Sequence, residues 1–157
     1  MRPAQVKSYL LNQVAQAKSG MGPYRRLPPM FTWGPPGIGK SQVVEQVAQE
    51  AGVKFKRVSA VNLDPTDVRG IPVPVDGTAV WVPPEFLPRA EKDGPVGILH
   101  WDDVGTAPPQ VQAALFRLLL EHQLDNYVMP DGWVQVASSN NVEDRALVKR
   151  LPSPIAN

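Results

Sequence analysis

The feature that most constrains the fold of this chain is a glycine-rich octet that begins at Gly34. Residues 34–41 read Gly-Pro-Pro-Gly-Ile-Gly-Lys-Ser, which matches the pattern G-x-x-x-x-G-K-[ST] at every fixed position. A short apolar run at 30–33 precedes the octet, and apolar residues recur at helical spacing over 43–48 before Gly52. Strand, glycine loop and helix in this order are the context of a phosphate-binding P-loop, so we predict one here.

Each residue type in this motif has a physical role toward phosphate. Glycines permit backbone conformations and close approaches that a Cβ would obstruct, so consecutive N–H groups can face phosphate oxygens. A helix that begins near Lys40 adds the positive end of its dipole. Lys40 can then reach the β- and γ-phosphates, and the Ser41 hydroxyl can bind Mg²⁺. We predict that ATP is bound by Gly34, Pro35, Pro36, Gly37, Ile38, Gly39, Lys40, Ser41 and Gln42.

Composition limits the number of domains, the kinds of partner and the location that this chain can have. A chain of 157 residues suffices for one domain, and its net charge of +1 indicates neither a nucleic-acid nor a membrane partner. The absence of cysteine excludes disulfides and thiolate metal sites. No apolar run approaches the roughly 20 residues of a membrane span, and the N-terminus lacks the apolar core of a signal peptide. We expect a single nucleotide-binding domain over residues 1–157, located in the cytoplasm.

A second functional stretch covers residues 96–103, where a mostly apolar run ends in Asp102 and Asp103. A buried strand of a parallel sheet would place both acids at the edge where ligands bind in open α/β folds. Asp102 would hold the Mg²⁺ ion and its water shell, and Asp103 would orient or deprotonate the attacking water. The competing interpretation is an Asp pair that only caps the next helix. We expect His100 to lie beside the core rather than to act as a ligand.

A third polar strand end follows the apolar residues 133–137. An amide at the tip of a strand next to the Asp102 strand can hydrogen-bond a water and the γ-phosphate together, so Asn140 is our candidate for this sensor role. Asn141 is the second choice, and a plain turn is the alternative. Lys40, Asp103 and Asn140 are therefore the predicted catalytic residues, and Ser41 and Asp102 are the predicted metal ligands.

The rest of the chain predicts short elements separated by prolines. We expect a helix over residues 3–18, a strand over 53–61 and a short helical turn at 64–70. Residues 71–82 alternate around Asp76-Gly77, as in a β-hairpin. Two prolines in its first half cannot donate to a ladder, so this hairpin must lie at an edge or protrude.

Five segments, taken in order, resemble the MoxR branch of the AAA+ ATPases: residues 34–41, 64–70, 97–103, 107–112 and 136–140. The resemblance runs from about Pro28 to the end of the chain. It implies an α/β fold of the P-loop NTPase type, with three α/β/α layers, a mainly parallel sheet and the hairpin as a protruding insertion. It also implies that the sensor strand lies between the P-loop strand and the Asp102 strand.

The same resemblance implies a function and partners. Members of this branch hydrolyse ATP with Mg²⁺, assemble into rings that are typically hexameric, and remodel protein partners, often ones with a von Willebrand A-type domain. The hairpin typically projects toward the ring pore.

Three departures from the family pattern qualify this expectation. The family has Asp-Glu where this chain has Asp102-Asp103, and a polar residue where it has Val104. In the family an arginine finger, a fifth strand and a helical lid follow a segment like residues 151–157. We therefore expect a truncated chain, or one that a partner completes, with the P-loop strand at a sheet edge. Arg145 and Arg150 remain candidate contacts in trans.

Two functions stay open on this basis. The first is an ATPase that remodels a partner. The second is an ATP-binding module with little or no turnover, in which the nucleotide serves structure or assembly; the shorter acid Asp103 and the missing arginine finger favour it. A kinase or GTPase fits less well, because no Asn-Lys-x-Asp guanine signal is present.

Overall fold

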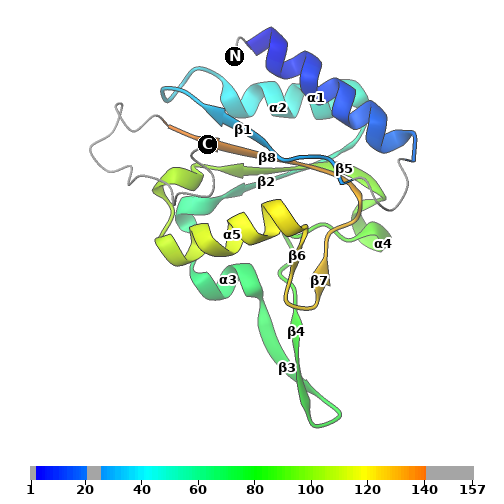
Figure 1. The fold of residues 1–157 in the computed structure, drawn as a ribbon, viewed down its shortest axis with the longest axis vertical. Helices are drawn as coiled ribbons and strands as arrows, with labels where there is room; N and C mark the ends of the chain where they lie inside the picture. Colours follow the sequence, from blue (N-terminus) through cyan, green and yellow to red (C-terminus); the bar gives the residue numbers. More distant parts are fainter. Residues whose placement is uncertain (1–2, 21–25, 141–157) are drawn as a thin grey trace.

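A parallel sheet forms the centre of the molecule, with strand order β1-β8-β5-β2 (Figure 1). The structure is a computed structural model, and it describes residues 3–20 and 26–140. The four strands of this sheet are β1 (Met30–Trp33), β2 (Lys54–Ser59), β5 (Val96–Asp102) and β8 (Gly132–Ser139). The predicted order, with β8 between the P-loop strand and the Asp102 strand, is confirmed.

The two central strands are apolar because helices cover both of their faces. Nearly every residue of β5 and β8 is buried, and Trp101 and Trp133 are fully so. The polar side chain of Gln135 is tolerated in β8 because its amide donates to Leu118 O and its carbonyl accepts from the Trp101 indole. Trp133 lies directly over Gly97, where a side chain of any size would collide with its ring.

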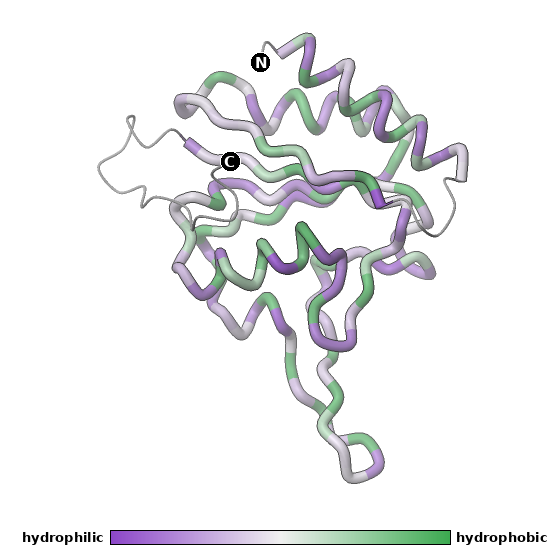
Figure 2. Tube along the Cα trace, viewed as in Figure 1, coloured by the Kyte–Doolittle hydropathy of each residue, from purple (hydrophilic) through white to green (hydrophobic). Residues whose placement is uncertain are grey.

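Helices complete a three-layer α/β/α arrangement. α1 (Pro3–Lys18) and α2 (Lys40–Ala51) cover one face of the sheet, and α5 (Pro109–Glu121) and the short α3 (Pro65–Arg69) cover the other (Figure 1). Hydrophobic residues, in green, recur along both the strands and the helices (Figure 2). The buried residues form two clusters, one on each side of the sheet. The predicted fold class is therefore confirmed.

The predicted hairpin is present and projects away from the sheet (Figure 1). β3 (Ile71–Val75) pairs with β4 (Thr78–Val82) in antiparallel register. Its base is held by α3 and by the loop between two later strands. The Arg69 guanidinium lies 4.7 Å from the centre of the Trp81 ring and forms an ion pair with Asp125, and Asn126 donates to Trp81 O.

Several smaller elements complete the described chain. They are the 3₁₀ turns η1 (Ala60–Asn62) and η2 (Val104–Thr106), α4 (Ala90–Asp93), and the two-residue strands β6 (Gln123–Leu124) and β7 (Tyr127–Val128). The predicted strand over 53–61 is shorter than expected, because the chain turns into η1 after Ser59. The β6–β7 pair was not predicted.

β1 pairs only with β8 in the described sheet and so occupies one of its edges. No helix among residues 3–20 and 26–140 is long and apolar enough to cross a membrane. Asn141, Arg145, Arg150 and the segment 151–157 lie outside the described residues.

Candidate nucleotide-binding site

The P-loop connects the end of β1 to the start of α2, at the carboxyl edge of the sheet. Gly37 and Gly39 have φ angles of 81° and 84°, a left-handed conformation that residues with a Cβ rarely adopt. This geometry brings the first turn of α2, which begins at Lys40, into the pocket. The unpaired N–H groups of that turn make it a favourable position for an anion.

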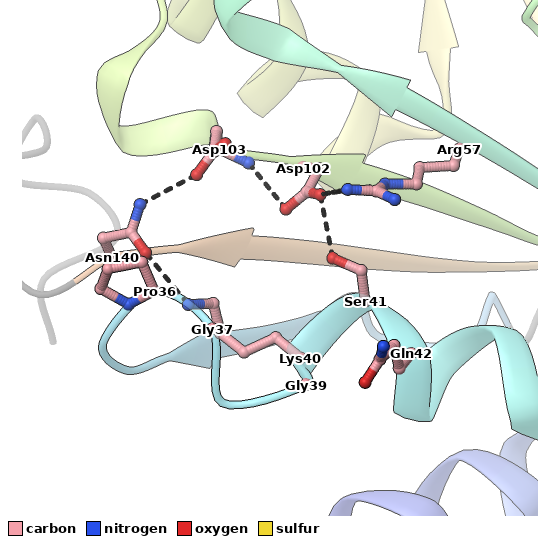
Figure 3. Close-up of a pocket in the computed structure, with 10 residues that line it drawn as sticks. All are labelled: Pro36, Gly37, Gly39, Lys40, Ser41, Gln42, Arg57, Asp102, Asp103 and Asn140. Atoms are coloured by element: carbon pink, nitrogen blue, oxygen red, sulfur yellow. Dashed lines mark hydrogen bonds and ion pairs between the residues drawn. The ribbon is translucent and has the colours of Figure 1, made fainter.

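Lys40 points back across the loop instead of out to solvent. Its ammonium group donates to Gly34 O at 2.8 Å, to Pro35 O at 3.0 Å and to the Asn140 side-chain oxygen at 3.1 Å (Figure 3). These three acceptors hold the charge where a phosphate would meet it. They also link the P-loop to the tip of β8, 100 residues further along the chain.

Asp102 lies at the end of β5 and receives hydrogen bonds from several elements. Its Oδ2 accepts from Ser41 Oγ at 2.9 Å and from the guanidinium of Arg57. Its Oδ1 accepts from Ser138 Oγ and from the backbone N–H of Asp103. Burial alone would raise the pKa of this carboxyl, but the side-chain hydrogen bonds outweigh burial and lower the pKa to about 2. Asp102 is therefore ionised at neutral pH.

Asp103 and Asn140 face each other across the same pocket. The Asn140 amide donates to Asp103 Oδ1 at 2.9 Å, while its oxygen accepts from Lys40 (Figure 3). The backbone of Asp103 is left-handed, with φ 56° and ψ 37°. A short polar side chain tolerates this conformation better than a longer one. The three predicted catalytic residues thus form one connected chain of hydrogen bonds.

His100 supports Asp102 indirectly. It is fully buried, stacks on Phe55, and reaches the carboxylate only through Ser138, whose Oγ lies 3.0 Å from Nε2. Because the Ser138 hydroxyl donates its hydrogen bond to Asp102, His100 must donate to Ser138 from Nε2. This leaves Nδ1 as an acceptor without a partner among the described residues. Burial lowers the pKa of His100 to about 4, so the ring is neutral at pH 7.

The site contains a pocket of about 340 Å³, a volume within the range of small-molecule sites. Its lining residues are Pro36, Gly37, Gly39, Lys40, Ser41, Gln42, Arg57, Asp102, Asp103 and Asn140 (Figure 3). Of the other predicted residues, Gly34 and Pro35 contribute carbonyls to Lys40. Ile38 instead lines a neighbouring apolar pocket.

That second pocket has a volume of about 70 Å³. Apolar residues of α1, β1 and α2 line it, among them Val6, Trp33 and Val43. Gly39 and Lys40 line both pockets, so the two adjoin at the start of α2.

The donor set suits Mg²⁺ better than a tightly caged metal. Residues 3–20 and 26–140 contain no group of three His, Cys, Asp or Glu side chains able to hold an ion. A hydroxyl at Ser41 hydrogen-bonded to an ionised Asp102 is nevertheless the kind of partial site that Mg²⁺ uses, because this ion keeps several waters and takes phosphate oxygens as further ligands. Ser41 and Asp102 therefore fit the predicted metal.

Two members of this network, Arg57 and Ser138, were not predicted. The sequence did contain a signal for Ser138. His100 and Asp102 are separated by two positions on β5, and Ser138 and Asn140 by two positions at the end of β8. Side chains two positions apart point to the same side of a sheet, so the members of each pair share a side. For Arg57 the sequence offered no such signal, because it is only one of several basic residues in β2.

A parallel sheet with this strand order, a P-loop after its edge strand and paired acids at the end of β5 defines the P-loop NTPase fold. The chain belongs to the AAA family, the ATPase family associated with various cellular activities, whose model matches residues 30–153.

Several known proteins share part of this sequence or this fold. Replication-associated recombination protein A of Coxiella burnetii is 41% identical over 46 residues, which cover 29% of this chain and 10% of that protein. A point mutant of RuvB from Thermotoga maritima superposes with a TM-score of 0.57 and 17% identity, covering 91% of this chain and 40% of RuvB. Hsp104, in a closed state with ATPγS and labelled casein, gives a TM-score of 0.60 and 21% identity, covering 82% of this chain and 24% of Hsp104.

The likeness to RuvB and Hsp104 establishes the fold alone, because both identities are low. This chain spans less than half the length of each of these relatives.

Proposed function

We propose that this chain binds Mg²⁺-ATP and hydrolyses it. The observation that carries the proposal is the connected chain from Lys40 through Asn140 to Asp103, with Ser41 and Asp102 beside it in the same pocket. It places a cation, an amide, and a carboxylate that can accept a proton around one space. Phosphoryl transfer needs little more than such positioning and charge stabilisation.

Each residue has a distinct part in this proposal. Lys40 exchanges its carbonyl partners for the β- and γ-phosphate oxygens. Asn140 turns its amide from Asp103 toward the γ-phosphate and the attacking water, and the freed Asp103 carboxylate accepts a proton from that water. Bound Mg²⁺ would neutralise charge on the β- and γ-oxygens. Ser41 and Asp102 would hold it, while the Ser41 hydroxyl continues to donate its hydrogen bond to Asp102.

We also infer membership of the MoxR branch, with a chaperone-like action on protein partners. The five ordered motifs and the projecting hairpin support it. A hexameric ring, a partner with a von Willebrand A-type domain and a cytoplasmic location are parts of the same proposal.

The alternative is a nucleotide-binding module with little turnover. It is favoured by Asp103 itself, since this acid is shorter than the glutamate of the family and is already engaged by Asn140. The two functions share the binding site and differ only in the fate of the γ-phosphate.

The test compares binding and turnover in matched variants. Calorimetry with Mg²⁺-ATP should show binding to the wild type and none to Lys40→Ala. Asp103→Asn should keep binding and lose phosphate release by at least about 100-fold, the usual worth of a general base. Asp76→Asn is the control, because Asp76 is also an aspartate at positive φ, but at the hairpin tip. Binding without release in the wild type would select the module, and wild-type affinity in Lys40→Ala would refute the site.

A further inference from the structure

Arg57 lies in the nucleotide pocket although no part of the motif contains it. Its position on β2, the strand next to β5, brings its guanidinium to Asp102. Nε and Nη2 both donate to Oδ2 of that carboxylate, at 3.0 and 2.5 Å. Figure 3 shows Arg57 approaching Asp102 from the side opposite Asp103. Its side chain is 56% exposed, so it can leave this position at little steric cost.

The carboxylate of Asp102 has no acceptor capacity left. A carboxylate offers about four lone-pair sites. Asp102 receives Ser41 Oγ and two nitrogens of Arg57 on Oδ2, and Ser138 Oγ and a backbone N–H on Oδ1. A metal ion, or a water bound to it, can reach Asp102 only if one of these donors withdraws.

Among these donors, Arg57 is the one that must withdraw. Ser138 is 1% exposed, and the Asp103 N–H belongs to the backbone. Ser41 can keep its hydrogen bond while its lone pairs face the metal. Arg57 is the most exposed of the side-chain donors and the only one with a charge, which repels a divalent cation.

We propose that Arg57 occupies the metal side of Asp102 in the nucleotide-free protein and competes there with Mg²⁺. This inference rests on the proposed function, since it concerns the metal that accompanies ATP. Without metal, the guanidinium supplies positive charge near the triphosphate. With metal, the guanidinium must leave Oδ2, against the attraction of the carboxylate. Arg57 therefore weakens the coupling between Mg²⁺ and ATP, and lowers the affinity of the site for metal before nucleotide arrives.

A contrasting role for Arg57 has the opposite consequence. If the guanidinium served to orient Asp102 toward the metal, its removal would weaken Mg²⁺ binding and reduce the coupling. The sign of one measured ratio separates the two.

The experiment measures the dissociation constant of ATP by calorimetry in excess EDTA and again in saturating Mg²⁺, at one ionic strength. The ratio of the first constant to the second reports the coupling. In Arg57→Gln we expect this ratio to rise about threefold or more, because a unit charge near a divalent ion is removed. Lys54→Gln is the matched control, since it removes the same charge from the exposed start of the same strand and leaves the pocket lining unchanged.

Arg57→Lys gives a second, independent comparison. It keeps the charge but loses the paired donors, so competition by charge predicts a ratio within about twofold of the wild type. A ratio that is unchanged or lower in Arg57→Gln, or one that rises equally in Lys54→Gln, overturns the proposal. Wild-type protein that binds no ATP under either condition would instead refute the proposed function, and this inference with it. Thermal unfolding in EDTA verifies that each variant is folded.

Discussion

Replacing Ser138 by alanine removes the link between His100 and Asp102. Ser138 is 1% exposed, donates to Asp102 Oδ1, and accepts from His100 Nε2 at 3.0 Å. The variant therefore takes a hydrogen bond from an ionised carboxylate and leaves a buried imidazole N–H without a partner. Water cannot easily replace the lost hydroxyl, because all three side chains are buried.

The expected cost follows from the partners. A hydrogen bond to a charged group contributes about 1.5–3 kcal/mol, and a buried donor without an acceptor costs about 1–3 kcal/mol more. Since these terms overlap, we expect Ser138→Ala to lower the free energy of unfolding by about 3 kcal/mol at pH 7. Urea denaturation monitored by tryptophan fluorescence measures this change.

Ser139→Ala provides the control in the adjacent position. Ser139 is equally buried, but its hydroxyl contacts only neutral backbone groups, accepting from Gly105 N–H at 3.2 Å. Its loss should cost about 1 kcal/mol. If the two variants were equally stable, the charge-assisted bond inferred at Ser138 would not exist.

The pH dependence gives a second check on the same variant. The pKa of Asp102 is about 2 in the folded protein and near 3.8 ordinarily, so its ionised form stabilises the fold fully above pH 4, and this contribution is lost as the pH falls toward 2. Ser138→Ala raises that pKa, so the loss of stability that it causes should shrink by about 1 kcal/mol between pH 6 and pH 2. Two other charged groups matter here: His100, whose pKa burial lowers to about 4, and the Arg57 guanidinium on Oδ2; both remain in the variant. A cost that is constant over this range would refute the reasoning.

Two further predictions concern the fold around the site. Gly97→Ala should destabilise the protein by about 1–3 kcal/mol in urea denaturation, because the new Cβ would lie 2.6 Å from the buried Trp133 ring. Arg69→Ala should speed hydrogen exchange in the hairpin while changing global stability by less than about 1 kcal/mol, since it removes an exposed ion pair and the cation–π contact to Trp81. Hairpin exchange equal to that of the wild type would show that Arg69 does not anchor β4.

The sequence predicted those parts of the fold that have a strong local pattern. β5 and β8 were predictable because long apolar runs end in polar residues, and the hairpin because alternation surrounds Asp76-Gly77. β6 and β7 have two residues each, too few for any periodicity, and their pairing depends on the packing of the loop around them.

The same difference separates the predicted from the unpredicted residues of the site. Lys40, Asp102 and Asn140 stand out because a motif or a strand end marks each, and the structure brings them into one pocket. Arg57 carries no such mark, because its partner lies 45 residues away and the contact exists only once β2 is paired with β5. Expectations for Asn141, Arg145 and Arg150 remain predictions.

The strand order explains why Asp102 can be controlled from both sides. β5 lies between β2 and β8, so the carboxylate at its end receives Arg57 from one neighbour and Ser138 from the other. α2 adds Ser41 from above the sheet edge. In an order that placed β1 beside β5, Ser138 and Asp102 would not meet across adjacent strands. The position of β8 between the P-loop strand and the Asp102 strand therefore has two effects. It presents Asn140 to the pocket, and it supplies the Ser138 hydroxyl that holds Oδ1 of Asp102. Oδ2 is then the oxygen for which a metal and Arg57 can compete.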